Sequence, residues 1–273
     1  MPYIKTKDST DLYVKDWGSG RAVVLIHGWP LNADSWDDHA YALANAGYRV
    51  ISYDRRGFGR SGQPWSGYEY DTLSDDLADV LEATGAHDAT LVGFSMGGGE
   101  IARYMSRHDG RGVAKAALIS SIVPFVLQTD DNPDGVPPAE IESIKDGILD
   151  DRPSFLATFF QSFYGVGWLT SPISQETLDW ALMMAMQAGL KPTLACVDAF
   201  SKTDFRTELS AFRVPTLVVH GTSDKTVPIA PTARAAAAGI AQAELIEYDG
   251  SPHGLIVTDR DRLTRDLVAF LAG

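Results

Sequence analysis

Uninterrupted apolar runs alternate with amphipathic stretches through most of the chain. A strand buried on both faces of a parallel sheet reads as such a run, which predicts strands over residues 21–27, 48–53, 89–94, 112–120, 214–220 and 243–248. Residues 2–17 alternate between polar and apolar and predict an antiparallel hairpin at the sheet edge. Helices are predicted between the strands, over residues 34–46, 70–84, 98–107, 229–240 and 258–272, with Asp34 or Ser35 as the cap of the first. This order predicts a doubly wound α/β fold with right-handed crossovers.

The pattern changes between residues 121 and 213. Four prolines interrupt its beginning, and helical stretches follow without a clear strand, over residues 138–149, 153–164, 175–188 and 192–201. We interpret residues 121–213 as a helical cap inserted into one domain that spans residues 1–273. The core of that domain is then formed by residues 1–120 and 214–273.

Composition narrows the classes of partner. A hydrophobic content of 45% and a charged content of 22% are ordinary for a globular protein. The formal net charge of −13 argues against nucleic acid or an anionic membrane as partner, because both require a basic surface.

Cysteine usage and targeting signals give expectations about location and cofactors. Cys196 is the single cysteine, so an intrachain disulfide is excluded and a buried thiol is predicted. The first residues lack the apolar core of a signal peptide, and no run of about 18 apolar residues occurs. We therefore expect a cytoplasmic protein. No cysteine–histidine spacing of a metal site and no dinucleotide-binding glycine motif occurs, so neither a metal nor another cofactor is expected.

A serine lies between a predicted strand and a predicted helix, in the sequence G-F-S-M-G at residues 93–97. Such a serine occupies a sharp, strained turn, and the flanking glycines remove the Cβ atoms that would clash with neighbouring backbone. The turn directs the Ser95 hydroxyl outward at the end of the sheet. Ser95 is therefore the candidate nucleophile, with a glycine-rich packing turn as the structural alternative.

A serine nucleophile needs a general base and a carboxylate that orients the base. His253 lies in a loop just beyond the last strand and is the candidate base. Asp224 follows the strand at 214–220 and is the candidate carboxylate. The alternatives are a solvated loop histidine at 253 and a helix-capping aspartate at 224, while Asp198 and Asp204 are rivals by sequence order.

Acyl transfer also needs an oxyanion hole. The N–H groups of Met96, directly after the serine, and Trp29, in the loop after the strand at 21–27, are the candidate donors. Pro30 has no N–H and is excluded as a donor. His27 is interpreted as a structural residue of that loop, and the arginines within residues 54–62 as ion-paired structural residues rather than a phosphate site.

Taken together, these motifs resemble a known family. The order Ser95, Asp224, His253 is similar to that of α/β hydrolases, which implies a mostly parallel eight-stranded sheet flanked by helices, with an inserted cap. Four segments resemble bacterial aryl esterases and cofactor-free haloperoxidases, also called perhydrolases: H-G-W-P at 27–30, Y-D-R-R-G-F-G at 53–59, G-F-S-M-G-G-G at 93–99 and T-D-F-R at 203–206.

The resemblance implies a chemistry as well as a fold. It implies hydrolysis of small carboxylic esters through an acyl-serine, some lactone or lactam turnover, and reaction of the acyl-enzyme with hydrogen peroxide to give a peracid that oxidises halide without a metal. The partners implied are a small ester and water or hydrogen peroxide, and a homo-oligomer, either a trimer or a hexamer. Haloperoxidase-type members carry proline at the position of Pro30, whereas Trp29 is esterase-like, so both activities are expected.

The apolar residues of the cap suggest a small, greasy acyl or aryl pocket, with plain packing of the cap on the core as the alternative. The pocket is expected to be lined by Trp29, Pro30, Ile122, Phe125, Val126, Phe159, Thr226 and Val227. A lactonase or C–C-bond hydrolase would use the same three catalytic residues. A non-catalytic, receptor-like member of the fold is the alternative from a different class. Dehalogenases and epoxide hydrolases of this fold need an aspartate where this chain has Ser95.

Overall fold

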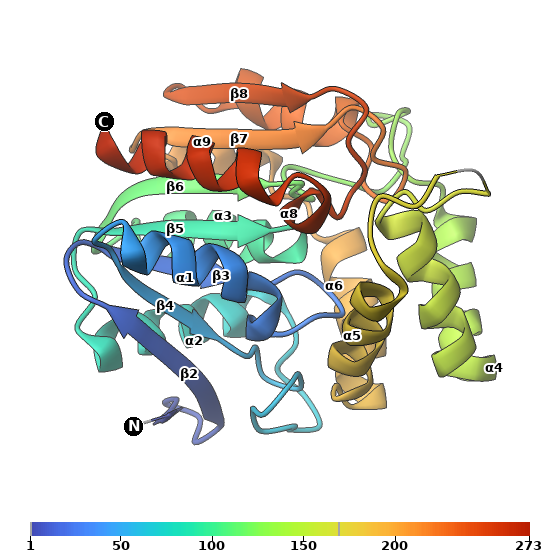
Figure 1. Cartoon of the computed structure of the whole chain (residues 1–273), viewed down its shortest axis with the longest axis horizontal. Helices are drawn as coiled ribbons and strands as arrows, with labels where there is room; N and C mark the ends of the chain where they lie inside the picture. The colour runs from blue at the N-terminus through green and yellow to red at the C-terminus, as the bar shows by residue number, and fades with distance from the viewer. Residues whose placement is uncertain (1, 169) are drawn as a thin grey trace.

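A computed structural model of the chain describes residues 2–168 and 170–273. Its centre is an eight-stranded sheet with the strand order β1-β2-β4-β3-β5-β6-β7-β8 (Figure 1). The strands are β1 Tyr3–Lys5, β2 Asp11–Gly18, β3 Ala22–Ile26, β4 Arg49–Tyr53, β5 Ala89–Phe94, β6 Val113–Ile119, β7 Thr216–Gly221 and β8 Ala243–Tyr248. The strands β1 and β2 pair antiparallel, as do β2 and β4, whereas all other neighbours are parallel. The predicted mostly parallel, eight-stranded α/β-hydrolase sheet is confirmed.

The central strands lie where the apolar runs predict them. Every residue of β3, β5 and β7 is buried, as expected for strands covered on both faces. Helices α1 (Asp37–Asn45) and α9 (Arg260–Ala272) pack together on one face of the sheet, and α2 (Tyr70–Thr84) and α3 (Met96–Arg107) on the other (Figure 1). The short helices η3 (Ala230–Arg234), α7 (Ala235–Gly239) and α8 (Leu255–Thr258) complete the core.

The first helix begins differently from the prediction. A 3-10 turn, η1 (Ala33–Trp36), precedes α1, and the side chain of Asn32 accepts the N–H of Asp34 at its start. Asn32 therefore caps the 3-10 turn, and α1 follows Trp36 without a side-chain cap, so the expectation of Asp34 or Ser35 is wrong. The turn tightens the chain before the regular helical repeat begins, so the capping position lies further upstream than the apolar pattern indicates.

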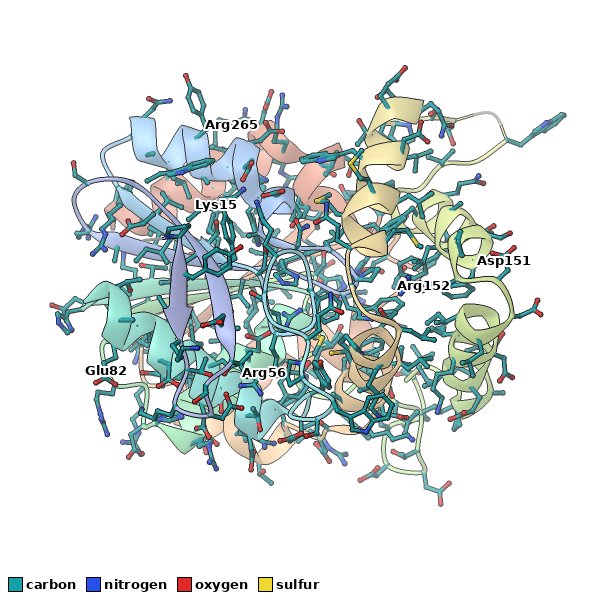
Figure 2. The ribbon with its side chains drawn as sticks, turned by 90° about the horizontal axis from the view of Figure 1, so that it is seen from below. Lys15, Arg56, Glu82, Asp151, Arg152 and Arg265 are labelled. Carbon is teal, nitrogen blue, oxygen red and sulfur yellow. The ribbon has the colours of Figure 1, made fainter. Side chains whose placement is uncertain are left out.

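Three helices between β6 and β7 lie together at the end of the sheet where the parallel strands point (Figure 1): α4 Pro138–Phe163, α5 Gln175–Met186 and α6 Leu190–Lys202. Helix α4 bends at Asp151, where φ is −148° and ψ is 86°, so its two halves correspond to the two helices predicted at 138–149 and 153–164. Next to the bend, Arg152 donates to the carbonyl of Ala188 at 3.0 Å and joins α4 to the α5–α6 turn (Figure 2). The 3-10 helix η2 (Arg206–Ala211) leads back into the sheet.

Two further findings concern residues away from the sheet. Cys196 on α6 is completely buried, as predicted, and burial raises the pKa of its thiol to about 12. Among the helices formed by residues 2–168 and 170–273, none combines the length and the apolar character needed to cross a membrane.

Candidate active site

Ser95 occupies the turn between β5 and α3 in a strained backbone conformation. Its φ of 53° and ψ of −118° are unfavourable for a residue with a side chain. A Cβ atom on Gly93 would lie 2.6 Å from the backbone of Gly97, and one on Gly97 would lie 2.6 Å from the carbonyl oxygen of Ile26. Glycine at both positions therefore permits the close approach of β5, α3 and β3 that holds the turn.

The structure brings the three candidate catalytic residues together. His253 Nε2 lies 3.0 Å from Ser95 Oγ, and His253 Nδ1 lies 2.6 Å from Asp224 Oδ2. The Nδ1 hydrogen is therefore donated to the carboxylate, and Nε2 accepts the serine O–H. All three side chains are at least nine-tenths buried. This arrangement transfers the serine proton to an imidazole that a carboxylate holds in the required tautomer.

The carboxylate of Asp224 is held from both sides. Its Oδ1 accepts the N–H groups of Thr226 and Val227 at 2.9 and 2.8 Å, and its Oδ2 faces two imidazoles, His253 and His220. Burial alone disfavours a charged carboxylate, but the positive charge that His253 carries when it is protonated, together with the close contacts of both imidazoles, outweighs it and holds the pKa of Asp224 well below its usual range. Asp224 stays ionised throughout the neutral pH range.

The two rival aspartates lie elsewhere. Asp198 forms ion pairs with Lys145 and Lys202 on the cap, and Asp204 forms an ion pair with Arg206. Both side chains are more than one-third exposed. Neither is bonded to an imidazole, so the geometry favours Asp224 as the partner of His253.

The candidate oxyanion hole lies where the loop after β3 passes beside Ser95. A Cβ atom on Gly28 would lie 3.0 Å from the Cβ of Ser95, which places the Gly28–Trp29 peptide against the nucleophile. Met96 is the first residue of α3, so its N–H has no partner within the helix. The N–H groups of Trp29 and Met96 therefore remain the candidate donors.

The indole of Trp29 joins this loop to the cap. Its Nε1 donates to the carbonyl oxygen of Thr193 in α6 at 3.0 Å. Its ring packs against Phe159 of α4 and Phe200 of α6, with centroid distances of 5.5 and 5.6 Å. The cap thus holds the residue that supplies one candidate oxyanion donor.

The loop at 54–62 is a network of ion pairs, as its sequence predicts. Buried Arg55 pairs with Glu100, and its Nη2 donates to the carbonyl of His27 at 2.6 Å. The imidazole of His27 accepts the N–H of Arg55 and lies 2.9 Å from the carbonyl of Gly28, and burial, followed by the charge of Arg55, lowers its pKa. His27 is therefore a neutral structural residue. Arg56 and Arg60 pair with Asp76 and Asp54 (Figure 2 labels Arg56).

A cavity of about 310 Å³ opens onto Ser95 and His253, between the sheet and the cap. Six of the predicted pocket residues line it: Trp29, Ile122, Val126, Phe159, Thr226 and Val227. Its other lining residues are Val136, Glu140, Ile141, Ser143, Ile144, Ser162, Phe200 and Lys225. The walls are mainly apolar, and the two charged residues are both exposed at the surface.

Two predicted pocket residues lie outside this lining, and that part of the prediction is wrong. Pro30 is buried in a tight turn in which the N–H of Leu31 bonds the carbonyl of Gly28. Phe125 packs its ring under the guanidinium of Arg206, 5.1 Å away, on the side of the segment that leads to η2. Backbone direction, rather than apolar character, decides which of these side chains reaches the cavity.

Within residues 2–168 and 170–273, no group of at least three His, Cys, Asp or Glu side chains is arranged to hold a metal ion.

The sequence profile of the alpha/beta hydrolase fold matches residues 21–259 of the chain. The chain belongs to the α/β-hydrolase family. Its relatives include the non-heme chloroperoxidase CPO-A1 of Kitasatospora aureofaciens, 44% identical with 99% of each chain covered. The bifunctional esterase/perhydrolase DCH of Acinetobacter calcoaceticus is 38% identical over the same share of each chain. Among solved structures, the bromoperoxidase from Bacillus anthracis superposes with a TM-score of 0.94 at 42% identity, covering 98% of this chain and 97% of the other.

Sequence reasoning missed several residues of this α/β hydrolase. Ile141 and Ile144 lie on the cavity side of the first half of α4, and their three-residue spacing after Pro138 is the signal for a shared helix face. His220 is placed by its sequence at the end of a strand, but its ring lies against the carboxylate of Asp224. The sequence signal for this contact is the four-residue spacing between His220 and Asp224, which allows the turn after the strand to place the two side chains side by side.

Proposed function

We propose that this α/β hydrolase cleaves small carboxylic esters through an acyl-serine and transfers the acyl group to water or hydrogen peroxide. The observation that carries this proposal is the hydrogen-bonded series Ser95, His253 and Asp224 at the wall of an apolar cavity. Relatives named as an esterase/perhydrolase and as haloperoxidases, similar over nearly the whole chain, support it.

Acylation begins when Ser95 Oγ attacks the ester carbonyl while its proton passes to His253 Nε2. The carbonyl oxygen becomes an oxyanion that accepts the N–H groups of Trp29 and Met96, and the N-terminus of α3 adds a favourable field. Asp224 stabilises the imidazolium. When the intermediate collapses, His253 returns the proton to the leaving alcohol, and the acyl group stays on Ser95.

Deacylation uses the same residues with a different nucleophile. His253 takes a proton from water, and the resulting hydroxide attacks the acyl carbonyl; when the intermediate collapses, the bond to Ser95 Oγ breaks, His253 returns the proton to Ser95, and the carboxylic acid is released. Hydrogen peroxide reacts in the same way and releases a peracid. The peracid then transfers its terminal oxygen atom, with the hydrogen, to a halide ion, which yields a hypohalous acid and leaves the carboxylate.

The cavity limits the substrate. A volume of about 310 Å³ is at the lower end of small-molecule sites, and its walls are mainly isoleucine, valine and aromatic side chains. We expect the preferred esters to carry a short, uncharged acyl group, with either an aryl or an alkyl leaving group.

The experiment measures ester hydrolysis and peroxide-dependent bromination in the same variant of Ser95, beside a control variant. We follow hydrolysis of p-nitrophenyl acetate, and bromination of an acceptor dye by bromide and hydrogen peroxide in acetate buffer, in the wild type, Ser95→Ala and Ser154→Ala. Ser154 is an exposed serine of α4 and serves as the control. Ser95→Ala is expected to lose at least ~10³-fold in both reactions, because removal of one member disables the catalytic unit.

The outcome shows whether hydrolysis and bromination share one acyl-serine intermediate or are two independent activities. Loss of ester hydrolysis with bromination retained in Ser95→Ala would contradict a shared intermediate. Retention of both would contradict Ser95 as the nucleophile. Cytoplasmic location and assembly as a trimer or hexamer stay predictions.

A further inference from the structure

A second imidazole, outside the proposed triad, lies against the carboxylate of Asp224. His220 is near the end of β7 and is fully buried. Its Nε2 lies 2.9 Å from the carbonyl oxygen of Val227 and 3.1 Å from Asp224 Oδ2. The same Val227 donates its N–H to Asp224 Oδ1 at 2.8 Å. One ring nitrogen of His220 thus touches both the carboxylate and the turn that holds it.

The surroundings of the ring fix its protonation. Both neighbours of Nε2 are acceptors, so Nε2 carries a hydrogen, which is donated to the carbonyl of Val227 while the carboxylate oxygen lies 3.1 Å from the same nitrogen. On the other side, Nδ1 is buried and has no hydrogen-bond partner among the residues that the structure describes. A hydrogen on Nδ1 would therefore be a buried donor left unsatisfied, which is costly. The geometry selects a neutral ring with its hydrogen on Nε2.

We propose that His220 is a positioning residue for the catalytic machinery: its neutral Nε2–H fixes the Asp224 carboxylate and the turn at 224–227 in the orientation that His253 requires. This inference rests on the proposed function. Asp224 Oδ2 then divides its negative charge between two N–H donors, and His253 is held by a carboxylate that cannot rotate.

Removal of the His220 donor has a predictable direction. With one N–H fewer, Oδ2 attracts the protonated His253 more strongly, so His253 takes up a proton at a higher pH and ceases to act as a base there. The charged groups that surround the ring come from three elements. They are Asp224 on the loop after β7, His253 after β8, and Glu247, which is register-paired with His220 in β8 and ion-paired with Arg234.

Two substitutions of matched shape isolate the donor. His220→Met and His220→Gln have similar length and volume, but only glutamine presents an N–H toward Val227 and Asp224. In His220→Met, the acid limb of kcat/KM for p-nitrophenyl acetate is expected to move about 0.7 pH unit upward, the size of one ordinary hydrogen bond. In His220→Gln, the limb is expected to return to within about 0.2 pH unit of the wild type. Thermal unfolding of both variants records the structural cost separately.

The result decides between positioning and plain packing. If His220 only fills space, both variants lower the maximal kcat/KM or the unfolding temperature, and the pH at which kcat/KM falls on the acid side stays the same. Coincident limbs in the wild type, Met and Gln variants, or equal shifts in both variants, would overturn the proposal.

A measurement on the wild-type protein tests the same inference without a variant or turnover. Nitrogen-15 NMR of the histidine rings is expected to show His220 with hydrogen on Nε2 and none on Nδ1 across neutral pH. Hydrogen on Nδ1 of the resting protein would refute the assignment. Because this readout needs no activity, it distinguishes a failure of the His220 inference from a failure of the proposed esterase function.

Discussion

Replacement of Asp224 by asparagine removes a charge at the centre of the site while it preserves shape. The structure shows why the substitution does not conserve function. Three N–H groups are hydrogen-bonded to the two carboxylate oxygens, those of Thr226 and Val227 to Oδ1 and the ring N–H of His253 to Oδ2, and His220 Nε2 lies 3.1 Å from Oδ2. A carboxylate accepts all of these hydrogen bonds, whereas an amide offers one oxygen and one NH₂ group.

The backbone decides how the amide is oriented. If its oxygen occupies the Oδ1 position, the two backbone N–H groups stay satisfied, and the NH₂ group faces His253. That imidazole must then present a bare Nδ1, which moves its hydrogen to Nε2 and leaves no acceptor for the Ser95 proton. The opposite orientation places the NH₂ group against two buried N–H groups, at a cost of about 1–3 kcal/mol for each unsatisfied donor. The first orientation is expected.

The expected loss in kcat is about 10⁴-fold, the effect of trapping the wrong tautomer in a serine triad. This corresponds to about 5.5 kcal/mol in the activation free energy. The assay is saturating hydrolysis of p-nitrophenyl acetate, with thermal unfolding to show that the variant is folded. Asp198→Asn and Asp204→Asn are the controls, because both carboxylates form exposed ion pairs, and both variants are expected to keep wild-type rates within a factor of about three.

A folded Asp224→Asn protein with kcat within about tenfold of the wild type would refute this reasoning. Loss of activity in Asp204→Asn or Asp198→Asn instead would assign the carboxylate elsewhere.

Two further predictions concern stability and reactivity. His39 is buried, with Nε2 2.8 Å from the carbonyl of Ile256, and burial lowers its pKa to about 4. Because a histidine in the unfolded chain binds a proton near pH 6.5, the unfolded state takes up more protons than the folded state below that pH. The free energy of unfolding therefore falls by about 3 kcal/mol as the pH drops from about 6.5 to about 4. Urea unfolding of the wild type and His39→Gln should show the wild type losing that much more stability across this interval, and parallel losses would contradict it. Burial raises the pKa of the Cys196 thiol to about 12. Ellman's reagent should therefore find no reactive thiol in the folded protein and one reactive thiol after denaturation. Rapid labelling of the folded protein would contradict this prediction and show that Cys196 is accessible.

The strands and the strained turn at Ser95 were predictable because their signals are local. β5 coincides with its apolar run, and the glycines around Ser95 mark a turn that few other sequences can form. The pairing of Ser95, Asp224 and His253 followed from the rule that loops after parallel strands meet at one edge of the sheet. Asn32 was missed as a cap because a 3-10 turn breaks the 3.6-residue period on which helix starts are judged.

The cavity was less predictable because its lining depends on how the cap docks. Phe125 and Phe159 are equally apolar, yet only Phe159 faces the cavity, because Arg206 binds the ring of Phe125 on another side. Ile141 follows a helical pattern that does not say which face meets the core. The four-residue spacing of His220 and Asp224 permits their contact, but the contact depends on the fold of the turn at 224–227, which no hydrophobic period predicts.

The contact between the Trp29 indole and the Thr193 carbonyl also bears on how this architecture can diversify. Helix α4 is tied to the site by Phe159, whose ring packs on the indole, and by the carbonyl of Phe163, which accepts the N–H of Gly254 next to His253. Helix α5 contributes no residue to the lining of the cavity as the structure describes it, so it can vary in length and sequence. Helix α6 does not have this freedom, because a shift of its first turn would move the peptide that faces the nucleophile. Exchange of caps between such enzymes would therefore succeed only when α6 is inherited together with the loop that follows β3.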